Sequence, residues 1–320
     1  MKKYLIIAVA ILFGLGAATI ASDLIIESKT QSFSETDNKI HFDGDVKVKL
    51  DNLNVVGDRA DITTKGSKLD TATFYDKPYA YQVQNNKKRE VKANILKLSL
   101  ITKVVRAEGD TQTTVMDGKK PIAVITADTQ EYDTKSNVMT AMGGVVIKYQ
   151  EINTFSDKAV IRTDKKGDLK RIDLFGNAKI NEKTNKAEAD HFIYDLVNEE
   201  LISEGHTMSH TEMDDGKALT IKGSRQQYSK KQNTFNCSGN VQVWYDDYYA
   251  KGPKMSVFPS KATNKFNEIY FTGRSFINQG EKTIYADKIK LQLKPKDFYA
   301  EGNAKTVIKN IQSQELEETK

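Results

Sequence analysis

Cysteine is almost absent from this chain of 320 residues, since Cys237 is the only one. A single cysteine excludes an intrachain disulfide, and a lone cysteine is more often a small buried apolar residue than a reactive thiol. Proline is also scarce, with 5 residues. Because proline removes a hydrogen-bond donor from a β-ladder, its scarcity favours long runs of paired strands.

Clustered charge and catalytic motifs are lacking as well. The formal net charge of +5 falls by two, to +3, without Lys2 and Lys3, and it is too evenly spread for a nucleic-acid-binding face. The nucleophile-elbow, phosphate-loop and zinc-helix motifs are missing, and no pair of carboxylates is set apart by spacing as in a glycosidase. We therefore expect no enzyme, no cofactor and no nucleic-acid partner.

Residues 1–21 are typical of a signal peptide. Met1-Lys2-Lys3 is positively charged, Tyr4 to Ala18 is an uncharged and mostly apolar run, and Thr19-Ile20-Ala21 is a small-residue cleavage site. The sequence therefore predicts export to the periplasm. Because the uncharged run is close to the minimum length of a membrane span, an uncleaved inner-membrane anchor is the alternative.

A short glycine motif returns along the rest of the chain at intervals of about 29 to 34 residues, which is typical of a repeat architecture. Its copies are Gly44-Asp45-Val46, Gly109-Asp110-Thr111, Gly143-Gly144-Val145, Gly176-Asn177-Ala178, Gly205-His206-Thr207, Gly239-Asn240-Val241, Gly273-Arg274-Ser275 and Gly302-Asn303-Ala304. Asp76-Lys77-Pro78 is a degenerate copy in the longest gap. We expect each copy to be a tight turn, because glycine tolerates positive φ.

A second motif, Ala-Asp, stands between the glycine copies, so we expect two strands per repeat, one after each motif. Its clearest copies are Ala60-Asp61, Ala127-Asp128, Ala189-Asp190 and Ala286-Asp287, with Ala93-Asn94 and Ser156-Asp157 as looser ones. The residues that follow alternate between apolar and polar, which predicts half-buried strands. The residues themselves thus predict an all-β fold, an elongated β-sandwich or β-solenoid of antiparallel strand pairs, with a flexible tail at 311–320.

These motifs resemble the OstA-like family of lipopolysaccharide-transport proteins, which includes the LptA-like periplasmic bridge proteins. The segments that carry the resemblance are 23–28, 39–48, 57–62, 72–78 and 142–147. Asp76 stands where the family usually has the glycine of a Gly-Lys-Pro-like turn. Roughly residues 22–150 resemble one family module, and residues 151–310 repeat its strand pattern as a second module or a continuous extension, so the chain is an extended or tandem form.

The resemblance implies an open β-jelly roll that holds lipid A acyl chains in an apolar groove and is not an enzyme. It also implies edge-to-edge pairing with inner- and outer-membrane transport components, and head-to-tail self-assembly. Apolar residues with the inward strand phase are the candidates for the groove. They are Val46, Val48, Ile62, Phe74, Leu98, Ile147, Ile180, Val243 and Leu291.

Three further clusters have a structural and a functional interpretation. His206 and His210, with Glu204 and Glu212, would share one face of a strand and form a metal cluster or a solvated polar face, and we favour the latter. The run Lys87-Lys88-Arg89 is expected in a hairpin loop, solvated or near lipid phosphates. The aromatic residues Trp244, Tyr245, Tyr248 and Tyr249 are expected to pack between strands, or to form a docking surface or sugar platform.

Two other functions stay open at this point. One is a periplasmic β-repeat scaffold that binds protein partners without lipid, and it predicts a closed, fully packed interior. The other is a carbohydrate-binding or carbohydrate-cleaving β-protein, which is favoured only by the aromatic cluster.

Overall fold

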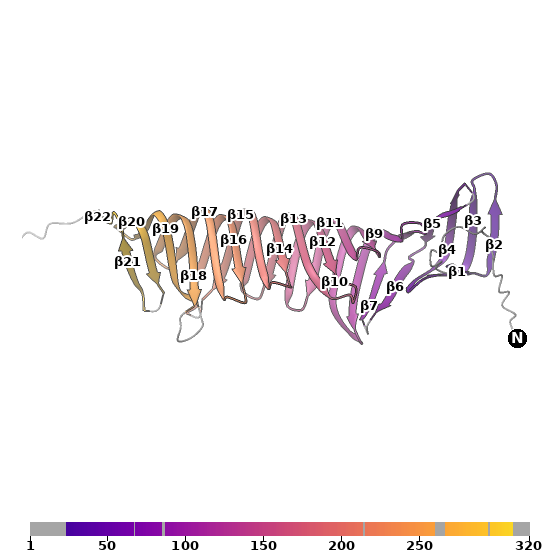
Figure 1. Cartoon of the computed structure of the whole chain (residues 1–320), viewed down its shortest axis with the longest axis horizontal. Helices are drawn as coiled ribbons and strands as arrows, with labels where there is room; N and C mark the ends of the chain where they lie inside the picture. Colours follow the sequence, from indigo (N-terminus) through magenta and orange to yellow (C-terminus); the bar gives the residue numbers. More distant parts are fainter. Residues whose placement is uncertain are drawn as a thin grey trace, which may run out of the picture. The chain divides into compact units, whose positions relative to one another are not determined.

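The computed structural model describes residues 24–66, 68–84, 87–213, 215–259, 266–293 and 295–309. Every secondary-structure element assigned in these residues is a β-strand (Figure 1), which confirms the all-β prediction. Within them, no helix is long and apolar enough to cross a membrane. The predicted signal peptide and the predicted flexible tail lie outside the described residues.

The contacts divide the chain into two units, which we describe separately. The first unit comprises residues up to Gln150 together with Arg162–Asp168, and the second comprises Glu151–Ile161 and the residues from Leu169 onward. The two modules expected at 22–150 and 151–310 stay a prediction.

The strands follow one another with short connections. Up to residue 149 they are β1 (Leu24–Glu27), β2 (Thr30–Ser34), β3 (Lys39–Leu50), β4 (Leu53–Lys65), β5 (Lys68–Tyr75), β6 (Tyr79–Gln84), β7 (Lys87–Lys92), β8 (Ile95–Ser99), β9 (Val104–Asp117), β10 (Lys120–Asp133) and β11 (Val138–Tyr149). From residue 152 they are β12 (Ile152–Thr163), β13 (Leu169–Glu182), β14 (Asn185–Asp195), β15 (Glu200–Glu212), β16 (Ala218–Ser229), β17 (Thr234–Tyr245), β18 (Tyr248–Pro259), β19 (Phe266–Gln279), β20 (Lys282–Gln292), β21 (Asp297–Glu301) and β22 (Lys305–Ile308).

Long consecutive strands pair as antiparallel hairpins within each unit, as β3 pairs with β4 and β17 with β18. Shorter strands pair in couples with one long strand: β1 and β2 both pair with β3, and β21 and β22 both pair with β20. In the same way β4 pairs with β5 and β6, and β9 with β7 and β8. Each couple is therefore one long strand interrupted in its middle.

The glycine motifs lie in the middle of strands, which corrects the expectation that each one ends a strand. Gly44 (φ 77°) and Asp45 (φ 52°) stand inside β3, where the register with β4 shifts between Asp43 and Val46. Two successive residues with positive φ bend the strand as a β-bulge does. The same pair of positive φ values recurs at 109–110, 143–144, 176–177, 205–206, 239–240 and 302–303. The degenerate copy is confirmed, since Asp76 (φ 66°) and Lys77 (φ 59°) both have positive φ between β5 and β6.

The Ala-Asp motif lies beside the glycine on the neighbouring strand and closes the bend. At Gly176 an added Cβ would lie 2.3 Å from Oδ2 of Asp157. The next residue, Asn177, donates a hydrogen bond from Nδ2 to the same Asp157 oxygen at 2.9 Å. The same arrangement occurs at Gly143, Gly205 and Gly302, where the added Cβ would meet Asp128, Asp190 and Asp287. At these positions the two motifs form one bend shared by two adjacent strands, and glycine is required because a carboxylate occupies the place of its side chain.

Each bend divides a strand into two halves, which we call arm A and arm B. In the first unit arm A comprises 39–43, 60–65, 68–75, 95–99, 104–108, 129–133 and 138–142, and arm B comprises 46–50, 53–57, 79–84, 87–92, 111–117, 120–126 and 145–149. In the second unit arm A comprises 169–175, 191–195, 200–204, 225–229, 234–238, 254–259, 266–272 and 288–292, and arm B comprises 178–182, 185–188, 207–212, 218–222, 241–245, 248–251, 275–279 and 282–285. Apolar residues of both arms belong to one cluster in each unit, so the arms face each other over a shared interior.

Candidate functional site

The interior of the first unit is an apolar cluster built by both arms. Phe42, Ile62 and Phe74 come from arm A, and Val46 and Val48 come from arm B. The side chains alternate along each strand, so every second residue faces this interior and the residues between face outward. Phe74 is completely buried. Five of the residues expected to line a groove belong to this one cluster: Val46, Val48, Ile62, Phe74 and Leu98.

The second unit has a corresponding cluster between β16 and the turn after β20. Val243 of arm B and Leu291 of arm A, both expected to line a groove, belong to it. Val241, Val243 and Tyr245 are buried in β17, which confirms the predicted alternation of that strand. Tyr245 adds a polar end to the interior, since its hydroxyl donates a hydrogen bond to Asp215 at 2.7 Å.

Two of the expected groove residues belong to neither of these clusters. Ile147, in arm B of the first unit, is buried. Ile180, in arm B of the second unit, is half-buried and lies opposite Ala187 of β14. Their inward phase fits the prediction of a lined interior, and their contact with a ligand stays a prediction.

Buried polar side chains, which the sequence motifs did not predict, also face the interior. Thr113 donates a hydrogen bond to Gln130 within the first unit, and Gln130 donates to the backbone oxygen of Ile125 at 3.0 Å. In the second unit the hydroxyls of Thr154 and Ser156 are buried, and no described residue forms a hydrogen bond with them. Threonine and serine at inward strand positions were the sequence signal that could have predicted them. Their hydroxyls interrupt the apolar lining and can form hydrogen bonds with a polar atom in the interior.

The turns at the ends of the arms form two rows, which we call rim A and rim B. In the first unit rim A contains the turns at 100–103, 134–137 and 164–168, where Thr134 N donates to Lys103 O at 3.4 Å and Thr163 N to Asn137 O at 3.1 Å. Rim B contains the turn at 51–52 and the first residue of β7, Lys87. The mouth is the space between the two rims, on the side of the interior opposite the bends.

Lysine–aspartate ion pairs cross the mouth in both units. In the first unit Lys103 of rim A lies 2.5 Å from Asp51 of rim B, and Lys87 of rim B pairs with Asp168 of rim A. In the second unit Lys296, in the turn after β20, pairs with Asp246 and Asp247 in the turn between β17 and β18. The rims are therefore in contact in this structure, held by charges at the border of an apolar interior.

In the second unit, hydrogen bonds stabilise the charged forms of both partners of the Lys296–Asp246 ion pair. Hydrogen bonds from Lys217 and Lys296 lower the pKa of Asp246, and the hydrogen bond to Asp246 raises the pKa of Lys296. The ammonium of Lys296 also lies 5.5 Å from the ring centroid of Tyr248, within cation–π range.

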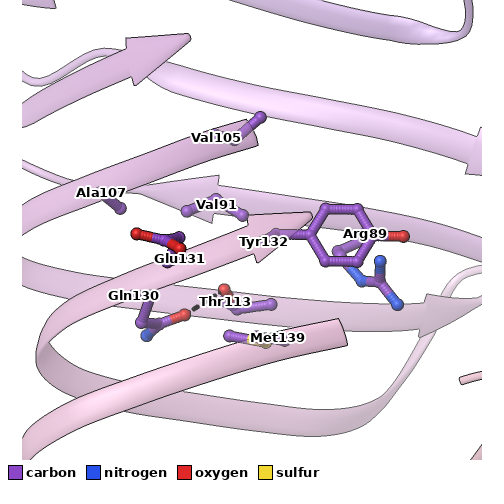
Figure 2. A pocket seen from close by; sticks show the side chains of 9 residues that line it. All are labelled: Arg89, Val91, Val105, Ala107, Thr113, Gln130, Glu131, Tyr132 and Met139. Carbon is purple, nitrogen blue, oxygen red and sulfur yellow. Dashed lines mark hydrogen bonds between the residues drawn. The ribbon is translucent and has the colours of Figure 1, made fainter. Parts of the chain in front are cut away.

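A small cavity of about 10 Å³ lies in the first unit, close to the room that one water molecule needs. Figure 2 shows that its lining mixes apolar, polar and charged residues of β7, β9, β10 and β11. The lining residues are Arg89, Val91, Val105, Ala107, Thr113, Gln130, Glu131, Tyr132 and Met139.

The histidine cluster does not form the single face that its spacing predicts. A register shift between Glu204 and Thr207 interrupts the alternation of β15. His206 is 93% exposed and its Nδ1 lies 2.8 Å from Oδ2 of Asp190, whereas His210 Nδ1 lies 3.0 Å from the hydroxyl of Thr220. Among the described residues, no group of three or more His, Cys, Asp or Glu side chains could hold a metal ion.

The aromatic cluster is divided between the two faces of the sheet. Tyr245 and Tyr248 are buried in the interior. Trp244 and Tyr249 lie at outward positions, with ring centroids 5.2 Å apart. On the same outward face, the ring centroids of Tyr249 and Phe276 are 5.7 Å apart. The row of outward aromatic rings therefore continues onto the neighbouring strand.

Cys237 is buried in the apolar cluster of the second unit, which confirms its expected role as a small apolar residue. Burial raises the pKa of its thiol to about 12. At neutral pH the group is therefore a thiol and not the nucleophilic thiolate.

The bent antiparallel strands and the interior between their arms place the chain among all-β proteins of the β-jelly-roll class. The family model described as LptA/(LptD N-terminal domain) LPS transport protein matches residues 25–122 and 124–208. These two matches cover more than half of the chain, which therefore belongs to this family of lipopolysaccharide-transport proteins. The family predicted from the sequence motifs is confirmed.

Among solved structures, the chain is similar to LptH from Pseudomonas aeruginosa, described as the LptA homologous periplasmic component of the conserved lipopolysaccharide transport device. The identity is 10% and the TM-score is 0.36, over 40% of this chain and 95% of that chain. No curated protein matches the chain significantly.

Proposed function

We propose that this protein is a periplasmic bridge or adaptor of lipopolysaccharide transport, which holds lipid A acyl chains between arm A and arm B and is not an enzyme. The observation that carries the proposal is the apolar interior that both arms build in a chain of this transport family. Burial of one methylene group contributes roughly 0.8 kcal/mol, so several acyl chains need few polar contacts to be held. The candidate residues are the nine named from the sequence.

The proposal includes export by the N-terminal segment, with inner-membrane anchoring as the alternative if that segment is not cleaved. It also includes pairing with other transport components through the terminal strands. β1 and β2 each pair with β3 in the first unit, and β21 and β22 each pair with β20 in the second. Among the residues that the structure describes, no further strand pairs with their second edges, whose backbone groups can accept an added strand, in a second copy or in a partner.

The test is photo-crosslinking in cells, with a photoreactive amino acid in place of Phe74 or, separately, of Leu291. Matched controls are Tyr75 and Phe258, because each is close to a buried residue in its strand but has the outward phase. We expect lipid A adducts at both inward positions and none at the outward ones. Adducts at Phe74 alone would assign the lipid to the first unit and make the second a docking extension. An exported, folded protein without adducts at either inward position would refute lipid binding.

The second candidate is a structural scaffold without lipid, and the dense packing of the interior favours it. Phe74 is 0% exposed and Leu291 is 1% exposed, as a closed core requires. The same crosslinking experiment separates the two functions, because a scaffold predicts adducts with proteins at the terminal strands and none with lipid in the interior.

A further inference from the structure

The basic run at the start of β7 has its charges on two opposite faces of the sheet. Lys87, Arg89 and Val91 share one face, since side chains alternate along a strand, and Val91 packs against the apolar cluster of the first unit. Lys88 faces outward, where its ammonium pairs with Glu90 and lies 5.0 Å from the ring centroid of Tyr81. The run was expected in a hairpin loop; the structure places it in a strand, so two of its three cations face the interior.

Arg89 extends toward the opposite arm. Its guanidinium carbon lies 4.3 Å from the ring centroid of Tyr132, which belongs to arm A and is 8% exposed. Figure 2 shows the guanidinium beside this ring, at one end of the small cavity. Within the part of the chain that the structure describes, no carboxylate forms an ion pair with Arg89. The carboxylate of Glu131, next to Tyr132, lies 3.8 Å from Arg106 instead.

Lys87 is the neighbouring cation at the mouth, and its partner comes from the other rim. The hydrogen bond to Asp168 is the main cause that raises the pKa of Lys87. Asp117 lies opposite Lys87 in the sheet, and the negative charges of Asp117 and Asp164 act in the same direction. Lys87 is thus a permanent cation whose present partner must move away when the two rims separate.

We propose that Lys87 and Arg89 bind the phosphate group of an anionic lipid whose acyl chains lie between the arms of the first unit. This inference rests on the proposed function and specifies the site of the head group. A phosphate offers several charged oxygens, which suit the fork of a guanidinium and the point charge of an ammonium. Apolar contacts lie beside Arg89, since Val91 and Val105 line the same small cavity as Arg89, and Lys87 precedes Arg89 by two residues on the same face of β7. An anion with apolar chains therefore finds both of its binding requirements on adjacent residues.

The exchange that the site requires is a replacement of one anion by another. With the two rims in contact, the carboxylate of Asp168 pairs with the ammonium of Lys87, and the ring of Tyr132 stacks on the guanidinium of Arg89. Acyl chains that enter through the mouth separate arm A from arm B, and this movement withdraws Asp168 and Tyr132 together, because both belong to the arm A side. The phosphate of the entering lipid then takes the place of the Asp168 carboxylate.

The test measures binding of the purified full chain to two probes with identical acyl chains, bis-phosphorylated lipid A and the same lipid A after removal of both phosphates. We expect the wild type to bind the phosphorylated probe about tenfold more tightly, since one hydrogen bond to a charged group has roughly that effect. Arg89→Gln and Lys87→Gln should each lose most of this preference. Lys88→Gln, the matched control from the outward face, should keep it.

Asp168→Asn gives a prediction of the opposite sign. It removes the competing charge and leaves both cations, so the affinity for the phosphorylated probe should rise, while the affinity for the dephosphorylated probe should change less. Equal preference in the wild type and in Arg89→Gln, or no gain in Asp168→Asn, would overturn the head-group site. If the wild type binds neither probe, the proposed lipid function itself fails. Thermal unfolding of each variant confirms that a lost preference is not lost folding.

Discussion

Replacing Gly176 by alanine tests the bend that shapes every long strand. Gly176 has φ +72°, where an alanine is strained by roughly 1–2 kcal/mol. The added Cβ would also lie 2.3 Å from Oδ2 of Asp157, so this carboxylate must move and lose the hydrogen bond from Asn177. That loss adds about 0.5–1.5 kcal/mol. We therefore expect Gly176→Ala to lower the free energy of unfolding of the second unit by roughly 2–3 kcal/mol.

Gly280→Ala is the matched control for this prediction. Gly280 also has positive φ, +56°, but nothing lies within 4 Å of its added Cβ, so only the strain remains. Urea unfolding followed by circular dichroism should therefore show a smaller loss for Gly280→Ala than for Gly176→Ala. In the Asp157→Ala background, Gly176→Ala should cost less than in the wild type, because the hydrogen bond is already absent. Equal losses for the two glycine variants would refute the shared bend.

Two more predictions follow from the pKa shifts. Because burial raises the pKa of Cys237 to about 12, a maleimide at pH 7 should label the thiol only after unfolding, and rapid labelling of the native protein would contradict its place in the core. The lowered pKa of Asp246 gives a contribution to stability that is complete above its ordinary pKa of 3.8 and is lost as the pH falls through the lower value of the folded state. Between pH 5 and pH 2, Lys296→Gln should therefore lose less stability than the wild type; parallel losses would show that Lys296 does not hold this carboxylate.

The strand pattern was predictable from the sequence, and the place of the glycines in it was not. In β17 the alternation of Val241 and Val243 with polar residues was sufficient, because an inward face must be apolar. Glycine at positive φ serves both hairpin turns and mid-strand bends, so the motif alone does not distinguish them. The hairpins here use other residues with positive φ, such as Asp51 (φ 54°) and Asp246 (φ 55°), which tolerate this region better than most side chains.

The site was predictable to the extent that it follows strand phase. Phe74 and Leu291 are buried as their phase requires. The ion pairs across the mouth were not predictable, because Lys87 and Asp168 are 81 residues apart and meet only when both arms are in place. Trp244, Tyr248 and Tyr249 were treated as one cluster because they are neighbours in sequence, although alternation separates adjacent side chains onto two faces of the sheet.

The closed interior and the proposed carrier function are compatible because of what holds the two arms together. The backbone hydrogen bonds of the ladder join strands along each arm, and the bends join the arms covalently, so separation of the rims breaks neither. Separation of the rims breaks apolar contacts and surface ion pairs such as Lys103–Asp51. Each surface ion pair contributes at most about 1 kcal/mol to stability. An entering acyl chain replaces the lost apolar contacts at roughly 0.8 kcal/mol per methylene, which water cannot do. The proposed function therefore predicts that the molecule closes without a ligand and that an apolar ligand stabilises an open form.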